Sequence, residues 1–117
     1  MYIVANRVPV AAPWREPFEE RFRTRAGQIE HQPGFVRLQV LRPDDAESPY
    51  VVLTTWRDRA AFEAWVGSED FRLAHQHPLP TEAYTGEGRL EQHEEVIAVE
   101  ARIAPSLPAR DRSESLG

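Results

Sequence analysis

The chain has 117 residues, 41% of them hydrophobic and 28% charged, with a formal net charge of −5. These values predict one globular domain, and the negative charge disfavours nucleic acid as a partner. The sequence contains no cysteine, which excludes disulfides and cysteine-ligated metal sites and favours a cytoplasmic location. We expect neither a membrane helix, which needs a run of about 18 or more apolar residues, nor a signal peptide.

The first predicted element is a strand at residues 2–8. Asn6 alternates there with apolar residues, and the strand period of two places it on one face with Tyr2, Val4 and Val8. A buried amide needs a hydrogen-bond partner, so Asn6 either bonds to local backbone or faces a ligand.

A helix is predicted next, from about Trp14 or Pro17 to about Glu30. Proline is tolerated in the first helical turn, which favours the later start, and Pro33-Gly34 ends the pattern. The apolar stripe of this helix recurs every three or four residues and consists of Trp14, Phe18, Phe22, Ala26 and Ile29.

Two strands follow, at residues 35–41 and 50–56, with a polar loop between them. The first alternates apolar and polar residues, which is typical of a half-exposed strand. The second is rich in β-branched and aromatic residues and is apolar on both faces.

Two short helices are predicted after the third strand. Asp58 is a suitable N-cap for a helix at residues 59–66, and Gly67 breaks that helix. Ser68 can cap a second helix, with acidic residues in its first turn, where they suit the helix dipole. His75 then lies near the end of this second helix, ten residues after Trp65.

The C-terminal part of the chain is less regular. Residues 77–92 form a long, mostly polar connection of the kind that often acts as a lid or binding loop. A last strand is predicted at residues 95–103, with Ile97 and Val99 on one face. Residues 104–117 are rich in Pro, Ser and Arg, which predicts a disordered tail.

The order strand, helix, strand, strand, helix, strand predicts an α+β domain of the ferredoxin-like, split-βαβ type over residues 1–103. Its helices would cover one face of a four-stranded antiparallel sheet. Because the strand at residues 50–56 is apolar on both faces, the other face also needs cover, which a second subunit supplies most simply.

Trp65 and His75 are the other candidate site residues, and each has two interpretations. Trp65 lies at the edge of a broken helix, where it is either a core residue or a pocket wall. A histidine near a helix end is either a surface group stabilised by the dipole or a ligand to haem iron. Phe71, one turn before His75, shares its helix face, and His77 is the alternative ligand.

Together, Asn6, Trp65 and His75 resemble the haem pocket of the IsdG-type haem-degrading monooxygenases, and in particular the MhuD branch, within the antibiotic-biosynthesis-monooxygenase superfamily. The resemblance covers the chain from Tyr2 to about Ile103. The matching stretches are Ala-Asn-Arg at 5–7, Glu-Arg-Phe-Arg-Thr-Arg at 20–25, Pro-Gly-Phe at 33–35, Leu-Thr-Thr-Trp at 53–56, Ala-Phe-Glu-Ala-Trp at 61–65 and Ala-His at 74–75.

The resemblance implies a role for each of these residues. His75 is then the proximal iron ligand, Trp65 helps to distort the porphyrin, and Asn6 is the distal hydrogen-bond donor. Phe22 and Arg25 match residues that line the family's pocket, and the ring of Phe71 can support the haem plane.

The resemblance also implies that haem is both cofactor and substrate of a haem-degrading monooxygenase. The ring is opened with O₂ and electrons from an external donor, with a reductase as a possible partner, and iron is released. The superfamily forms face-to-face dimers with an α+β barrel. Haem carries two propionates, so a net negative protein needs local positive groups to bind it, and Arg21, Arg25 and Arg72 are the candidates.

Three other functions fit the same residues. The first is a cofactor-independent oxygenase of the same superfamily that acts on a phenol or quinol. The second is a non-catalytic haem carrier or sensor that uses the same histidine. The third is a small dimeric domain without small-molecule chemistry, in which Asn6, Trp65 and His75 belong to the core.

Overall fold

The computed structural model describes residues 1–24 and 28–102. Four antiparallel strands form one sheet in the order β2-β3-β1-β4. The strands are β1 (Tyr2–Val8), β2 (Phe35–Leu41), β3 (Tyr50–Trp56) and β4 (Arg89–Glu94). The helices are α1 (Arg15–Thr24), α2 (Arg59–Val66) and α3 (Glu69–Ala74), and the 3₁₀ turns are η1 (Ala12–Trp14), η2 (Ile29–His31) and η3 (Thr81–Ala83).

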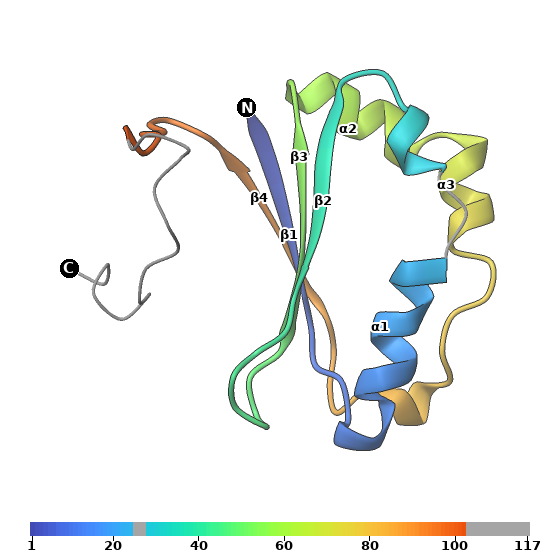
Figure 1. Ribbon diagram of the computed structural model, residues 1–117. Coiled ribbons are helices and arrows are strands. Elements are labelled where there is room, and N and C mark those ends of the chain that lie inside the picture. Colours follow the sequence, from blue (N-terminus) through green and yellow to red (C-terminus); the bar gives the residue numbers. More distant parts are fainter. Residues whose placement is uncertain (25–27, 103–117) are drawn as a thin grey trace.

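All three helices lie on one face of the sheet (Figure 1). The predicted ferredoxin-like α+β fold is thereby confirmed. In the described part of the chain, no helix is both long and apolar enough to cross a membrane.

The predicted end of the first helix is wrong. Within the described residues α1 covers Arg15–Thr24, and residues 25–27 lie outside them. Ile29 begins the separate 3₁₀ turn η2, so the predicted last turn of the helix, at residues 29 and 30, is not α-helical. The apolar stripe reached as far as Ile29 because that side chain is buried in the core, which does not require a continuous helix.

The prediction of the last strand is also wrong. The strand β4 is Arg89–Glu94, within and just after the predicted loop, and it pairs with β1 so that Glu94 lies opposite Tyr2. One further bond joins the amide of Glu95 to the carbonyl of Met1 at 2.8 Å. Among the described residues no further pairing with β1 follows this bond, and Ile97 and Val99 are 81% and 89% exposed. Residue 103 and the predicted tail, 104–117, lie outside the described residues.

The helix breaks around residue 67 follow the predicted capping pattern. The side chain of Asp58 accepts a hydrogen bond from the amide of Ala61 at 2.9 Å and so caps α2. The hydroxyl of Ser68 accepts from the amide of Phe71 at 3.1 Å and caps α3. These two caps place Trp65 at the end of one short helix and His75 directly after the next.

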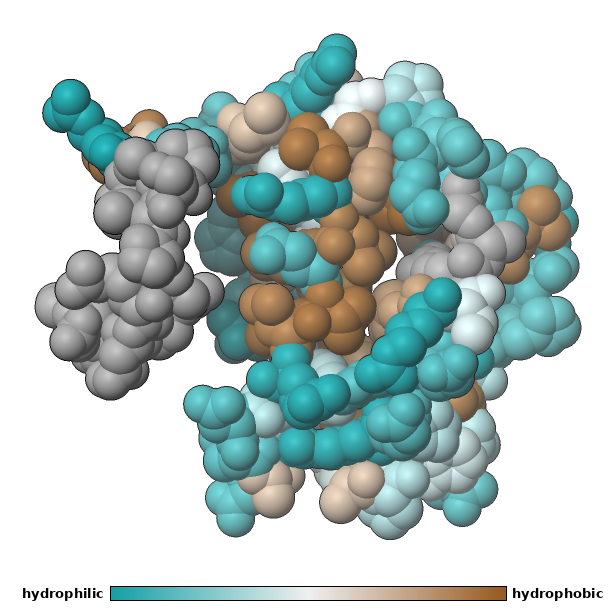
Figure 2. Space-filling view, viewed as in Figure 1, coloured by the Kyte–Doolittle hydropathy of each residue, from teal (hydrophilic) through white to brown (hydrophobic). Residues whose placement is uncertain are grey.

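Two hydrophobic clusters join the helices to the sheet, one at each end. The first contains Trp56, which is fully buried, together with Val4, Ile29 and Trp65. The second is built from Val10, Phe18 and Tyr50. Figure 2 shows apolar side chains gathered at the middle of the molecule, between bands of hydrophilic ones.

Candidate functional site

A cavity of about 850 Å³ lies between the sheet and the helices. All four strands, all three helices and the connection from α3 to β4 contribute to its walls. Its volume is within the range of about 300–1,000 Å³ typical of small-molecule sites. Of the residues predicted for the site, those that line it are Asn6, Arg21, Phe22, Trp65, Phe71, His75 and the alternative ligand His77.

His75 follows the last residue of α3 and is exposed to the cavity. Its Nδ1 lies 2.8 Å from the carbonyl oxygen of Phe71. A carbonyl only accepts hydrogen bonds, so in the neutral ring Nδ1 carries the proton and Nε2 keeps a free lone pair. The two rings also pack together, with centroids 4.1 Å apart. Both contacts fix the imidazole by its Nδ1 side, so Nε2 is directed away from the Phe71 carbonyl.

Trp65 is both a core residue and part of the cavity wall. It is 4% exposed and stacks on Trp56, with ring centroids 6.5 Å apart. Phe71 meets its edge at 5.4 Å, at an interplanar angle of 82°. The rings of Trp56, Trp65, Phe71 and His75 therefore form a continuous series from the core to the candidate ligand. The core interpretation of Trp65 and the pocket interpretation are both satisfied.

Asn6 lies on the face of β1 that points toward the helices, between Val52 on β3 and Leu90 on β4. The side chain is exposed to the cavity, and among the described residues it has no hydrogen-bond partner. The expected alternative, an amide bonded to local backbone, does not occur in the described part of the chain. Gly88 leaves space above it, since a Cβ there would lie 3.7 Å from Oδ1 of Asn6. The amide is thus available to a molecule in the cavity.

The three arginines predicted to bind the haem propionates differ in their surroundings. Arg21 lines the cavity and forms no ion pair with a described residue. Arg72 is paired with Glu69, one turn away on α3, so it is already neutralised. Arg25 lies outside the described residues.

The sequence did not single out several residues of the cavity. Leu38, Val52 and Thr54 form part of its floor on the sheet. Alternation within β3 places Val52 and Thr54 on the same face of the strand, which is the signal that could have found them. The pairing of β3 with β1 then sets these residues opposite Asn6 and Val4. Tyr84 also lines the cavity, but it follows a short turn in an irregular connection, where no periodicity marks it.

A family model described as "Antibiotic biosynthesis monooxygenase" matches residues 1–77. A heme oxygenase (mycobilin-producing) of Mycobacterium tuberculosis is 42% identical over 60 residues, which is 51% of this chain and 57% of that protein. A staphylobilin-producing heme oxygenase of Staphylococcus haemolyticus is 38% identical over 80 residues, or 66% of this chain and 75% of its own length.

Among solved structures, the heme-degrader MhuD from Mycobacterium tuberculosis, with two hemes bound in its active site, superimposes with a TM-score of 0.72. The two chains are 32% identical, and the match covers 86% of this chain and all of that one.

Proposed function

Since this chain belongs to the antibiotic biosynthesis monooxygenase family, we propose that it is a haem-degrading monooxygenase. The observation that carries the proposal is the placement of His75 and Asn6. A histidine with a free Nε2 and an amide without a described partner line one mostly apolar cavity. The similarity to heme oxygenases and to a heme-bound structure supports the same function.

The donor set fits haem. Within residues 1–24 and 28–102, no three His, Cys, Asp or Glu side chains gather to hold a metal ion. In haem the porphyrin supplies four nitrogen ligands to the iron, so the protein needs to supply only one, such as an imidazole. His75 would bind the iron through Nε2, because its hydrogen bond to the carbonyl of Phe71 fixes the tautomer and orientation that this requires.

Trp65 and Phe71 would press on one side of the macrocycle. Both side chains line the cavity, and Trp65 is held from behind by the buried Trp56. A flat ring that cannot retreat imposes its shape on a flexible partner, since protein cores resist small displacements. This contact gives Trp65 the role of distorting the porphyrin.

Asn6 would act on the opposite side, from the sheet. Its NH₂ group donates hydrogen bonds and does not release a proton at ordinary pH, so it would hold an oxygen atom in the cavity without protonating it. Phe22 on α1 completes the wall. Arg21 would bind a propionate, since it is the cavity cation without an ion pair among the described residues, and Arg25 is a second candidate.

When bound, haem supplies the redox chemistry, in which O₂ and electrons from an external donor open the ring. His75 would hold the iron, the apolar walls of the cavity would limit the access of water, and Asn6 would donate a hydrogen bond into the cavity. A reductase, or another source of electrons, belongs to this proposal, and so does a cytoplasmic location, where reducing equivalents are available.

A homodimer is the last part of the proposal. The helices cover one face of the sheet, and the other face carries Ile3, Val51 and Leu53, with Leu41 43% exposed. Val96, Ile97 and Val99 are more than 80% exposed just beyond β4. Apolar surface of this extent favours cover by a second subunit, which would give the expected α+β barrel.

Titration of the purified protein with hemin, followed by ascorbate in air, tests the function. We expect a saturable Soret shift, then loss of the Soret band with release of iron. A shift that is stable under ascorbate and air would instead assign a haem carrier or sensor. Absence of any saturable shift would reject haem and leave the cofactor-independent oxygenase.

A further inference from the structure

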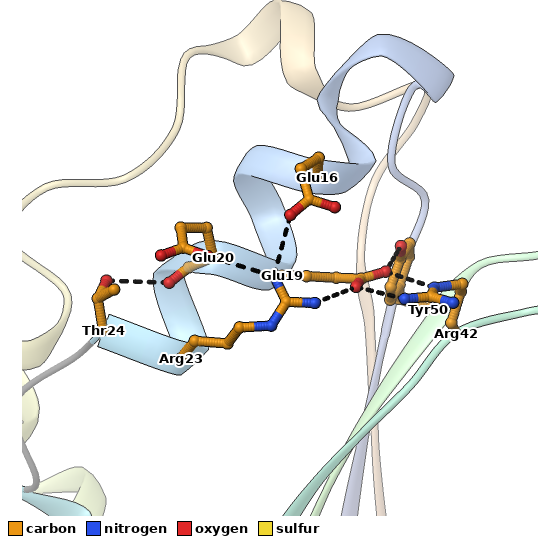
Figure 3. A network of polar contacts seen from close by, with 7 residues as sticks. All are labelled: Glu16, Glu19, Glu20, Arg23, Thr24, Arg42 and Tyr50. Carbon is orange, nitrogen blue, oxygen red and sulfur yellow. Dashed lines mark hydrogen bonds and ion pairs between the residues drawn. The ribbon is translucent and has the colours of Figure 1, made fainter.

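A buried carboxylate joins α1 to the sheet at one end of the cavity. Glu19 is 8% exposed and lies on α1, directly after Phe18 and three residues before Phe22. Its two oxygens accept hydrogen bonds from Nε and Nη2 of Arg42, both at 2.6 Å, and from Nη2 of Arg23 at 2.9 Å. The hydroxyl of the fully buried Tyr50 donates to it as well. Figure 3 shows these side chains converging on the carboxylate from three elements.

The geometry keeps Glu19 ionised. Hydrogen bonds from Arg42 and Tyr50, with the positive charges of Arg42 and Arg23, lower the pKa of Glu19 to about 2 against the opposing effect of burial. Four donors on one carboxylate fill nearly all its acceptor positions. A buried charge satisfied in this way has one favourable position, because any shift of the helix breaks several charge-assisted bonds at once.

This network fixes the N-terminal half of α1, since Glu19 is the fifth of the ten residues of that helix. Arg42 directly follows β2 and Tyr50 opens β3, so the carboxylate ties the helix to two strands. Phe18 packs on the Tyr50 ring at 4.8 Å. Arg15 adds a bond from Nη2 to the carbonyl of Asp45 at 2.9 Å, at the same end of the helix. The side of α1 beyond Glu19 that carries Arg21 and Phe22 faces the cavity instead.

There is open space on both sides of Phe22. The main cavity of about 850 Å³ and a second hollow of about 310 Å³ share Phe22 and Leu38 as lining residues. Glu19 and Arg23 line the second hollow. Phe22 and Leu38 therefore belong to the boundary between the two spaces, and the position of α1 determines where Phe22 lies.

We propose that Glu19 is a positioning residue for the cavity. Its bonds to Arg42 and Tyr50 hold α1 at a fixed distance from the sheet, and they thereby fix Phe22 against the ligand. For haem as the ligand the inference rests on the proposed function. Glu19 does not touch the ligand, so its effect is transmitted through Phe22 and appears in the shape of the bound macrocycle.

The distance across the cavity provides a test that does not need haem. Because the chain has no cysteine, spin labels can be placed uniquely at Glu20→Cys on α1 and Glu63→Cys on α2, both exposed positions. The background carrying native Glu19 should give one narrow distance distribution. Glu19→Gln in the same background should broaden or shift it, and an unchanged distribution would overturn the proposal.

The spectrum of bound hemin provides the second test, in chains without labels. Glu19→Gln should bind hemin several-fold more weakly, with a shifted Soret maximum and altered out-of-plane bands in the resonance Raman spectrum. Glu20→Gln is the matched control: it also removes a partner of Arg23 but is exposed, and its spectrum should equal that of the wild type. A Glu19→Gln spectrum identical to the control would overturn the positioning role.

Two further variants separate positioning from a general loss of structure. Arg42→Gln removes the guanidinium that makes two of the four hydrogen bonds to the carboxylate, and Tyr50→Phe removes one. Both variants leave Arg23 in place, so if Glu19→Gln does not fold, they should still shift the spectrum of bound hemin away from that of the wild type. Wild-type spectra in both variants would count against the proposal. If the wild type binds no hemin, the proposed function fails, while the label distances still decide whether Glu19 positions α1.

Discussion

Nδ1 of His75 donates a hydrogen bond to the carbonyl oxygen of Phe71 at 2.8 Å. The bond spans one helical turn and uses a carbonyl at the C-terminal end of α3, where backbone oxygens lack helical partners. The same interaction therefore completes the end of the helix and frees Nε2 of the imidazole. The end of α3 and the proposed binding of iron by His75 therefore depend on the same hydrogen bond.

The first prediction concerns the iron ligand. His75→Ala should abolish the Soret shift at micromolar hemin, because the imidazole is the metal-binding group. His77→Ala should keep it, although His77 lines the same cavity. His93→Ala is the matched control, since that side chain lies on the outer face of β4, opposite Ile3. The measurement is an absorbance titration, and tight binding by His75→Ala would transfer the ligand role to His77.

The second prediction concerns Asn6. Asn6→Leu keeps the approximate shape of the side chain but removes the amide, so hemin should still bind. The rate of ring opening should fall on the order of 10²–10³-fold, the usual cost of removing one preorganised hydrogen-bond donor. Single-turnover loss of the Soret band measures this rate. A rate equal to that of Glu63→Gln, an exposed substitution on α2 that does not line the cavity, would remove Asn6 from the reaction.

The third prediction follows from the turn before β2. Gly34 has a φ of +82°, and a Cβ there would lie 2.5 Å from that of Ala61. Gly34→Ala adds backbone strain to this clash, so unfolding free energy should fall by at least about 1 kcal/mol. In Gly67→Ala the nearest atom is 3.6 Å away and φ is −85°. Urea denaturation should show a clearly smaller loss for this control.

The fourth prediction concerns pH. The pKa of Glu19 is lowered from 4.5 to about 2 in the folded protein, so the folded state binds the proton more weakly than the unfolded state. Its contribution to stability is therefore full above pH 4.5 and is lost as the pH falls toward 2. The difference in unfolding free energy between wild type and Glu19→Gln should shrink over this interval. A difference independent of pH between 5 and 3 would contradict the assigned ionisation.

Patterns within single elements predicted much of the fold. The strands β1 and β2 follow from alternation, β3 follows from its β-branched and aromatic residues, and the caps Asp58 and Ser68 follow from residue chemistry at helix starts. These features depend on neighbours within a few positions, so a single sequence contains the information needed to find them.

The last strand was predicted at residues 95–103 but lies at Arg89–Glu94, because its position depends on residues far away in the sequence. Residues 97–101 alternate more regularly than Arg89–Glu94, yet the polar segment is the one that pairs with β1. A strand is defined by hydrogen bonds to a partner distant in sequence, and β1 offers its free edge only to residues that the connection after α3 can bring there. Periodicity carries no record of that partner.

The sequence alone determined which residue types were available: a histidine at a helix end, an aromatic residue one turn before it, and an amide on a strand. The tertiary structure decided that Asn6, Trp65 and His75 line one cavity and that the amide of Asn6 has no partner among the described residues. It also decided that Glu19, unremarkable in the sequence, is buried beneath Arg42 and Tyr50. The physical reason is the same throughout, because burial and pairing arise from groups far apart in the chain, whereas alternation and capping arise from near neighbours.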